Sequence, residues 1–513
     1  MITMTSALMR TERLYGNRLA IIDSEANYSW KEHIQRVKKL SGGLKDLGIT
    51  KGACYGIIGP NSFRYTELIH AGYWLGAIPV PINHRLAPPE ILHILEDANI
   101  EYLALGEDYL NLTDNELLEP WGSKRIVIGP KSPDDKIPAI DAIIKTGSAV
   151  LPNDPNENDL AILLYTGGTT GRSKGVQLTH RNVCSNGYQV INAMNIVKED
   201  IYLHVAPQFH AADLLSSGFT MNGAAHSYVP VFSPKAVLKA IQDYKVTQAM
   251  MAPTMIIMIL EEPTFDDYNI SSYRNLFYGS SPMAAEWVEK AIERFSNAGV
   301  QQGYGLTETS PILTTFDADD HQKAVESGNI DILRAAGRPL IGIDLRIFDN
   351  DDIEVPTGQA GEVCVRGPNV TPGYLNQPDE NKKAFKNGWF HTGDIGRVDE
   401  NGILFLMDRK KDMIVSGGEN IYTSEVEAAL YKHPDVFECA VIGVPDYKYG
   451  EALLAVIVPV PGKKLEEEVI IEHCRKLIAG FKIPRQIDFV DELPKSAMAK
   501  ILKNELREIY RKK

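Results

Sequence analysis

The stretch LLYTGGTTGRSKGVQLTH, residues 163–180, determines how the rest of the chain is interpreted. An apolar run ends at Tyr165, and the next six residues are all glycine or threonine: Thr166, Gly167, Gly168, Thr169, Thr170 and Gly171. Lys174 follows, and a second apolar run begins at Val176. Glycines allow backbone N–H groups to turn toward one point, threonine hydroxyls add hydrogen-bond donors, and Lys174 adds a positive charge. The stretch therefore predicts a loop that binds a polyphosphate.

Two other interpretations of this loop are weaker. A Walker-type loop needs serine or threonine directly after its lysine and then a helix, whereas Lys174 is followed by Gly175 and a predicted strand at 176–178. A simple hairpin turn would explain the glycines. It would not explain so many hydroxyls beside two cations, so the phosphate-binding interpretation is favoured.

The loop resembles the phosphate loop of the adenylate-forming superfamily, which includes acyl-CoA synthetases, adenylation domains and luciferases. The usual pattern of that loop is Y/F-T/S-S-G-T-T-G-x-P-K-G. The chain departs from it at Gly167, where serine is usual, and at Ser173, where proline is usual. The resemblance implies that Thr166–Gly171 and Lys174 surround the phosphates of ATP.

The composition limits the class of protein. The chain has 513 residues, 44% of them hydrophobic, which is enough for two or three domains. Its formal net charge of −14 argues against nucleic acid as a main partner, because a phosphate backbone requires a basic face. The five cysteines are far apart without a CxxC pair, so we expect reduced thiols in a cytoplasmic protein, and neither a disulfide framework nor a zinc site. No apolar run reaches the ~18 residues of a membrane-spanning helix. Peripheral membrane association and homodimer formation stay open.

Strands and helices are predicted to alternate along the first two thirds of the chain. Strands are expected at 54–58 and 161–165, for example, with helices at 30–47 and 62–75. This alternation predicts an α/β fold with doubly wound sheets. Short strands and turns at about 340–408 predict a small β-barrel-like part, after which a smaller α+β domain begins. We expect a large N-terminal domain at 1–408 and a small C-terminal domain at 413–513.

A second motif, QQGYGLTET, occupies residues 301–309. Tyr304 offers a flat face for a nucleotide base, Thr307 a hydroxyl for a phosphate, and Glu308 a carboxylate suited to Mg²⁺. The alternative is a solvated loop. The family pattern Y/F-G-x-T-E is matched at every defined position, so the resemblance implies that Tyr304 and Gly305 bind the nucleotide and that Glu308 is the metal ligand.

Two motifs concern the acid substrate. A lone histidine such as His210 is more often structural than catalytic. The resemblance places the sequence Pro-Gln-Phe-His, ending at His210, on the floor of the acid pocket, with His210 orienting the carboxylate. Gly279, Ser280 and Ser281 follow an apolar run, where an open α/β sheet places its ligand loops. They could instead begin a helix; the resemblance assigns them to the wall around adenine and substrate.

The remaining motifs lie toward the C-terminus. The sequence WFHTGD ends at Asp394, for which the resemblance implies contact with both ribose hydroxyls, and Arg409 would be a second ribose contact. The resemblance also makes 409–412 a hinge centred on Lys411, with the small domain mobile. Without it, 408–412 would be a solvated run of charges.

The last two motifs belong to the small domain. Gly417 and Gly418 match a glycine-rich pattern that the resemblance assigns to the pantetheine tunnel. The sequence PKSAMAKI maps the family's catalytic lysine onto Lys500, with Ala499 where glycine is usual.

Taken together, the motifs predict an AMP-forming acyl-CoA synthetase with ATP, Mg²⁺ and coenzyme A as cofactors. The apolar surroundings expected for the acid favour a medium or long fatty acid. Three alternatives remain: a ligase for an aryl or cyclic acid of the coumarate or ferulate type, an adenylation enzyme that loads a carrier protein, and a degenerate, non-catalytic nucleotide-binding protein.

Overall fold

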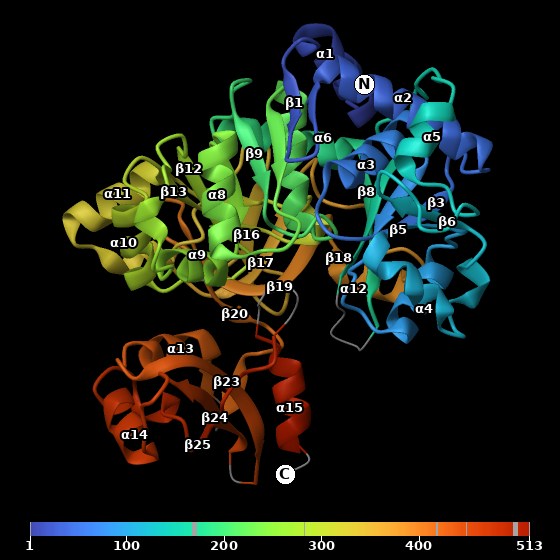
Figure 1. Ribbon diagram of the computed structural model, residues 1–513. Helices are drawn as coiled ribbons and strands as arrows, with labels where there is room; N and C mark the ends of the chain where they lie inside the picture. The colour runs from blue at the N-terminus through green and yellow to red at the C-terminus, as the bar shows by residue number, and fades with distance from the viewer. Residues whose placement is uncertain are drawn as a thin grey trace.

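The computed structural model describes residues 2–166, 172–281, 283–416, 419–447, 449–495 and 501–511 (Figure 1). The chain forms a large upper body, which contains the helices α1 to α12, and a smaller lower body, which contains α13 to α15 (Figure 1). This arrangement confirms the α/β class and the larger N-terminal and smaller C-terminal parts expected from the sequence.

The largest sheet of the described residues has nine strands, in the order β15-β14-β13-β12-β11-β9-β10-β1-β2. Its centre, from β13 to β1, is parallel, so the carboxyl ends of those strands meet at one edge. Its strands are β1 (Leu19–Ile22), β2 (Asn27–Ser29), β9 (Ile201–His204), β10 (Ala225–Tyr228), β11 (Gln248–Met251), β12 (Asn275–Gly279), β13 (Gly299–Tyr304), β14 (Thr314–Phe316) and β15 (Arg338–Pro339). Apolar residues of β9, β11 and β12 are fully buried in its core.

A second, four-stranded parallel sheet has the order β4-β3-β5-β6, and a separate antiparallel hairpin, β7-β8, packs against β4. Their strands are β3 (Cys54–Ile58), β4 (Ile78–Pro81), β5 (Tyr102–Gly106), β6 (Arg125–Ile128), β7 (Leu160–Thr166) and β8 (Lys174–Thr179). The phosphate loop thus connects two antiparallel strands. A helix does not follow Lys174, which agrees with the distinction drawn from a Walker-type loop.

The helices of the large body lie between and over these sheets. They are α1 (Met4–Tyr15), α2 (Trp30–Asp46), α3 (Phe63–Leu75), α4 (Pro88–Asp97), α5 (Ile140–Thr146), α6 (His180–Ala193), α7 (Ser216–Asn222), α8 (Pro234–Tyr244), α9 (Pro253–Leu260), α10 (Ala285–Arg294), α11 (Ala318–Ser327) and α12 (Pro378–Ala384). Within the described ranges, none of the helices is both long and apolar enough to cross a membrane.

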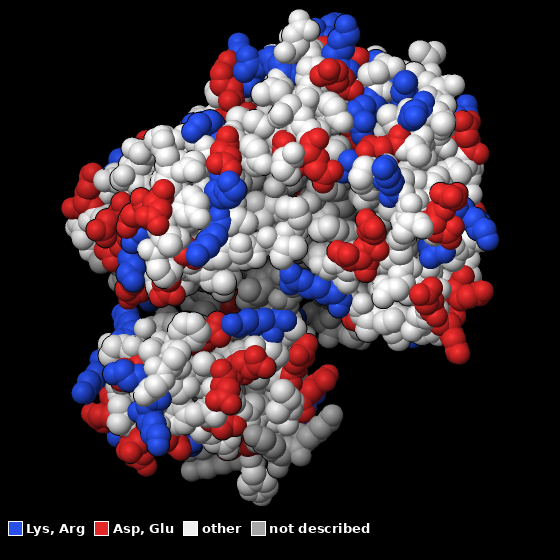
Figure 2. Space-filling view, viewed as in Figure 1, with Lys and Arg blue, Asp and Glu red and all other residues white. Residues whose placement is uncertain are grey.

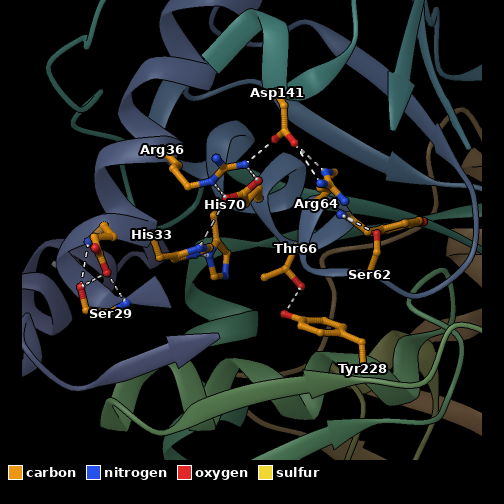
Figure 3. Close-up of polar contacts among 12 residues, drawn as sticks. Ser29, His33, Arg36, Ser62, Arg64, Thr66, His70, Asp141 and Tyr228 are labelled. Carbon is orange, nitrogen blue, oxygen red and sulfur yellow. Dashed lines mark hydrogen bonds and ion pairs between the residues drawn. The ribbon is translucent and has the colours of Figure 1, made fainter. Parts of the chain in front are cut away.

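Polar contacts join α2 to α3 inside the large body (Figure 3). His33 Nε2 lies 2.9 Å from His70 Nδ1, and both rings are buried. Nearby, Asp141 accepts hydrogen bonds from Arg36 Nη2 at 2.6 Å and from Arg64 Nη2 at 2.9 Å. Burial in a medium of low polarity disfavours the charged imidazole, so the pKa of His33 lies well below its usual value and that of His70 falls to about 3.

The β-rich part is a five-stranded antiparallel sheet in which β17 and β20 both flank β19. Its strands are β16 (Asp344–Phe348), β17 (Gly361–Arg366), β18 (Phe385–Lys386), β19 (Trp389–Val398) and β20 (Leu404–Arg409). The chain leaves this sheet after Arg409 and enters the sheet of the small body at Ile414. That crossing coincides with the segment for which the sequence predicts a hinge.

The small body contains a five-stranded sheet covered by three helices. Its elements are β21 (Ile414–Ser416), β22 (Glu419–Ile421), α13 (Thr423–Tyr431), β23 (Val436–Asp446), β24 (Gly450–Pro459), α14 (Glu467–Arg475), β25 (Gln486–Phe489) and α15 (Lys503–Arg511).

Candidate active site

One end of the site is built from three strands, β13, β19 and β20. The Tyr304 hydroxyl donates to Asp394 Oδ2 at 2.7 Å, and Arg409 Nε lies 3.2 Å from Asp394 Oδ1. Asp394 and Arg409 are direct partners in the β19–β20 ladder, so the sheet itself sets their distance. Burial and the adjacent carboxylate raise the pKa of the Tyr304 hydroxyl, which therefore remains a donor. Since a carboxylate offers about four acceptor positions, Asp394 can also accept from ribose hydroxyls.

Glu308 lies beside this group, in a short 3-10 turn, Thr307–Thr309, that follows β13. The Tyr374 hydroxyl donates to Glu308 Oε1 at 2.8 Å. Burial raises the pKa of Glu308, although the hydrogen bond from Tyr374 and the charge of Arg409 act against that shift. A single protein carboxylate held in this way fits Mg²⁺, which usually takes one or two carboxylates and obtains its other ligands from phosphates and water.

The end of the site predicted to bind phosphate lies at the start of β8. Lys174 Nζ lies 2.5 Å from Glu380 Oε2 and 5.4 Å from the centre of the Tyr374 ring. The hydrogen bonds from Lys174 and Lys383 lower the pKa of Glu380 to about 2, so its carboxylate is ionised. A cleft of about 600 Å³ opens beside Lys174, and its lining includes Arg172 and Ser173.

Figure 2 shows a hollow between the upper and lower bodies, with Lys and Arg side chains at its edges. The protein is acidic overall, with 67 acidic against 53 basic residues. Local cations in an acidic chain favour a site for anionic groups over a general nucleic-acid surface.

Hydrogen bonds to α3 and to the loop before it fix the segment that carries His210. The Gln208 N–H donates to Asn61 Oδ1 at 2.8 Å, and Gln208 Nε2 donates to Thr66 Oγ1 at 2.8 Å. Thr66 in turn accepts from Tyr228, as Figure 3 shows. His210 Nδ1 accepts from Ala212 N at 3.2 Å, which fixes the plane of the imidazole ring. A cavity of about 30 Å³ lies behind His210 and is lined by polar as well as apolar residues.

Gly279 ends β12, and Gly303 lies directly opposite it on β13. A Cβ atom at Gly279 would lie 2.5 Å from the Gly303 carbonyl oxygen, and one at Gly303 would lie 2.3 Å from the Phe277 ring. Neither position therefore accepts a side chain. Ser280 follows with φ of 72°, a left-handed conformation that turns the chain sharply at the carboxyl edge of the sheet. Ser281 comes directly after this turn.

The chain between the two bodies makes contacts on both sides. Lys410 Nζ lies 3.0 Å from Glu362 Oε2 of β17, and Asp412 Oδ1 accepts from Arg507 Nη2 of α15 at 2.6 Å. Lys411 lies between these two anchored residues. The hinge role assigned to it remains a prediction.

The structure brings together several residues that the sequence singled out: Tyr304, Gly305, Thr307 and Glu308 lie at the end of β13 and just after it, beside Asp394 within β19 and Arg409 at the end of β20. Thr166 and Lys174 are paired across the β7–β8 hairpin. Gly167, Gly168, Thr169, Thr170, Gly171, Gly417, Gly418 and Lys500 lie outside the described residues.

Sequence reasoning missed Tyr374 and Glu380, which contact the predicted Glu308 and Lys174. The segment before α12 runs beside both sites, because Thr371 N donates to Glu308 O and Leu375 N donates to Gly175 O, each at 2.8 Å. Nothing in the sequence around Tyr374 or Glu380 indicates these long-range contacts, since a tyrosine after a glycine and a glutamate in a charged segment are common at protein surfaces.

A buried carboxylate paired with tyrosine and arginine, a separate carboxylate suited to a metal ion and a lysine at the start of β8 can together hold a nucleotide. The chain belongs to the AMP-binding enzyme family, whose profile matches residues 8–375, and the profile of the AMP-binding enzyme C-terminal domain matches residues 425–500. Together with the CoA ligases that it resembles, this membership makes it an AMP-forming acid–thiol ligase that uses ATP and coenzyme A.

Three known proteins illustrate the similarity. The chain is 33% identical to a feruloyl-CoA synthase from Amycolatopsis sp, with 97% of each chain covered. It is 32% identical to a 2-succinylbenzoate–CoA ligase from Bacillus cereus (strain Q1), with 99% of each covered. An anthranilate CoA ligase solved in complex with anthranoyl-AMP superposes with a TM-score of 0.89 at 26% identity, covering 99% of this chain and 97% of that one.

Proposed function

We propose that this protein activates an aromatic carboxylic acid with ATP and transfers the acyl group to coenzyme A. The three relatives are named as enzymes for feruloyl, succinylbenzoate and anthranilate groups, all of which contain an aromatic ring. The sequence alone favoured a fatty acid because the expected pocket is apolar. An aromatic ring suits the same apolar surroundings, and the relatives support it over the fatty acid.

The observation that carries this proposal is the extent of the similarity to ligases of aromatic acids. The chain matches the feruloyl-CoA synthase over 97% of each length at 33% identity and the 2-succinylbenzoate–CoA ligase over 99% at 32%. Gly279 and Gly303 lie side by side at the carboxyl edge of the large sheet, where open α/β sheets bind ligands. The buried side chains of Phe277, Met250 and Ile312 pack around these glycines and make this part of the edge apolar.

The chemistry follows from the charges around the nucleotide. A carboxylate oxygen of the acid attacks the α-phosphorus of ATP, the bond to the bridging oxygen breaks, and pyrophosphate leaves with the electron pair. The thiol of coenzyme A then attacks the acyl carbon, loses its proton and displaces AMP. Asp394 and Arg409 fix the ribose, Lys174 binds departing phosphate oxygens, and His210 orients the acid carboxylate. Mg²⁺, when bound, would neutralise phosphate oxygens, and Glu308 is the residue that would hold it.

A pyrophosphate-release screen tests the substrate class. The acids are benzoate, anthranilate, ferulate, 2-succinylbenzoate, octanoate and palmitate, each with and without coenzyme A. We expect kcat/KM for the best aromatic acid to exceed that for palmitate by at least ~10-fold, a factor that pocket shape alone can provide. A higher value for palmitate would reject the aromatic proposal. Pyrophosphate release without use of coenzyme A would point to another acceptor.

A variant beside Gly279 tests where the acid pocket lies. Met250→Ala should shift preference toward longer acids by about 10-fold, because it removes the side chain nearest Gly279. Met255→Ala is the matched control, since Met255 belongs to the same core cluster but lies on α9. The same shift in both variants would move the acid pocket elsewhere.

Lys500 is the residue that we propose to bridge the acid carboxylate and the α-phosphate during the first half-reaction. Lys500→Ala should therefore reduce adenylate formation at least ~100-fold and affect thioester formation from preformed acyl-adenylate much less. Lys495→Ala is the control from the same motif, because Lys495 Nζ is paired with Glu438 at 2.6 Å. Equal losses in the two half-reactions would remove Lys500 from this role.

A further inference from the structure

We propose that Glu362, Cys364 and His391 form a binding site for a transition-metal ion of the Zn²⁺ class, at the base of the segment that joins the two bodies. Cys364 on β17 and His391 on β19 are direct partners in the ladder between these strands. Their side chains converge with that of Glu362, and one ligand atom from each lies within 4.8 Å of the other two.

The distances match those around a tetrahedral ion. Cys364 Sγ lies 3.3 Å from His391 Nδ1, and the same nitrogen lies 3.4 Å from Glu362 Oε2. Sulfur, nitrogen and oxygen ligands at usual zinc bond lengths stand about 3.4 to 3.6 Å from one another in tetrahedral geometry. The two distances from His391 Nδ1 already match, and the third pair, Cys364 Sγ and the Glu362 carboxylate, lies within 4.8 Å and would close around one ion.

The donor set selects the class of ion. A thiolate with an imidazole and a carboxylate suits Zn²⁺ or Co²⁺, whereas Mg²⁺ prefers oxygen ligands alone. When the ion binds, the bond from sulfur to the metal replaces the S–H bond, and the thiol proton leaves to solvent. The oxidation state of the metal and of the sulfur does not change.

A further carboxylate lies next to His391, and one side of the cluster is partly exposed to solvent. Asp352 Oδ1 lies 3.8 Å from His391 Nε2, the ring nitrogen that faces away from the cluster. This separation is longer than a hydrogen bond, so Asp352 would have to approach slightly to orient the imidazole and favour coordination through the opposite nitrogen. Cys364 is fully buried, while the side chains of His391 and Glu362 are 7% and 11% exposed, so an ion can approach from their side.

Lys410 connects this site to the segment that joins the two bodies, because it forms an ion pair with Glu362. Its Nζ lies 3.0 Å from Glu362 Oε2, the oxygen that would bind the ion, while Glu362 Oε1 accepts from Gly393 N at 3.2 Å. A metal ion and the Lys410 ammonium therefore compete for one carboxylate oxygen. Occupation of the site would release Lys410 from the large body, next to the residues that connect to the small one.

The cysteine spacing gave no sign of this site and led to the expectation that no zinc site exists. The two principal ligands are 27 positions apart and come from neighbouring strands. Local patterns such as CxxC report ligands that share a loop, whereas these ligands meet only when the sheet forms.

Cobalt binding to the full chain tests the proposal. The untagged protein is treated with a chelator, dialysed and titrated with Co²⁺ while its absorption spectrum is followed. We expect one equivalent of Co²⁺ to produce a near-ultraviolet thiolate-to-cobalt charge-transfer band together with visible bands of tetrahedral intensity, and Zn²⁺ to remove both. A titration in which no charge-transfer band appears, with the protein shown to be folded, overturns the proposal.

Matched variants locate the ion. Cys364→Ser should abolish the charge-transfer band, whereas Cys439→Ser, at a buried cysteine of the small body, should leave it unchanged. Asp352→Asn should weaken Co²⁺ binding about 10-fold, as expected for an outer carboxylate. Thermal melting establishes that each variant is folded. A band that survives in Cys364→Ser, or that is lost in Cys439→Ser, contradicts the assignment.

A variant that should bind Co²⁺ more tightly distinguishes this site from adventitious binding. Lys410→Met removes the competing ammonium and should tighten Co²⁺ binding about twofold to fivefold, the range expected for loss of an exposed ion pair. It retains all three ligands and therefore keeps the charge-transfer band. Weaker binding in Lys410→Met would contradict the shared role of Glu362 Oε2.

Discussion

The two ends of the proposed nucleotide site are held in different ways. At the proposed ribose end, Asp394 is buried, and its partners Tyr304 and Arg409 are fixed by strands of two sheets. At the proposed phosphate end, Lys174 pairs with Glu380 of α12, whose side chain is 25% exposed. If the nucleotide binds as proposed, the first end already has its hydrogen bonds formed, whereas at the second end a phosphate must replace Glu380 as the partner of Lys174. Preorganisation should then matter most at the first end and charge competition at the second.

The largest effect should come from the ribose end. Asp394→Asn retains the shape of the side chain and an acceptor for Tyr304 but removes the charge that would accept from the ribose. We expect kcat/KM for ATP to fall about 100-fold, corresponding to hydrogen bonds to a charged group. Asp344→Asn is the control, because Asp344 is also an arginine-paired aspartate of the same sheet but is partly exposed and pairs with Arg346 and Arg366 away from the site. A comparable loss in both variants would remove the special role of Asp394.

An intermediate effect is expected for Tyr374→Phe, between the two ends. This variant removes the hydrogen bond to Glu308, so we expect about a 10-fold lower kcat/KM for ATP at neutral pH. It should also move the acid limb of the pH profile upward, because burial raises the pKa of Glu308 and the Tyr374 hydrogen bond opposes that rise. Glu308 must be ionised to hold Mg²⁺, so activity is lost as pH falls through its pKa.

Tyr431→Phe provides the comparison for Tyr374→Phe, since its hydroxyl contacts the backbone of Cys439 in the small body. That variant should leave the acid limb in place. If the limb does not move in Tyr374→Phe either, Tyr374 does not act through Glu308.

The smallest effect, and one of opposite sign, is expected for Glu380→Gln. Loss of the carboxylate frees Lys174 for phosphate, so KM for ATP should fall about twofold to threefold, within the range of a partly exposed ion pair. Because the pKa of Glu380 is about 2, this effect should be the same throughout the assay range, unlike that of Tyr374→Phe. Glu354→Gln, which disrupts an ion pair with Arg346, should not change KM. A higher KM in Glu380→Gln would mean that Glu380 orients Lys174 for ATP.

The sequence predicted the parts of the fold and site that depend on local pattern. Alternating apolar runs located strands such as Cys54–Ile58, whereas the motif around Glu308 was recognised without the prediction that it follows a strand, β13. The contacts of Tyr374 with Glu308 and of Lys174 with Glu380 could not be predicted, because 66 and 206 positions separate the partners. Such pairs depend on how sheets and loops pack, which no periodicity in one chain records.

The close pair of imidazoles that joins α2 to α3 has a consequence for acid denaturation. His33 and His70 are buried in their neutral forms, with pKa values lowered by burial, whereas in the unfolded chain they would titrate near their usual value of about 6.5. Below that pH the unfolded chain binds protons that the folded chain does not bind. Acidification therefore lowers the free energy of unfolding by up to about 1.4 kcal/mol per pH unit for each ring. The two imidazoles buried between the N-terminal helices are therefore one source of acid sensitivity in the folded protein.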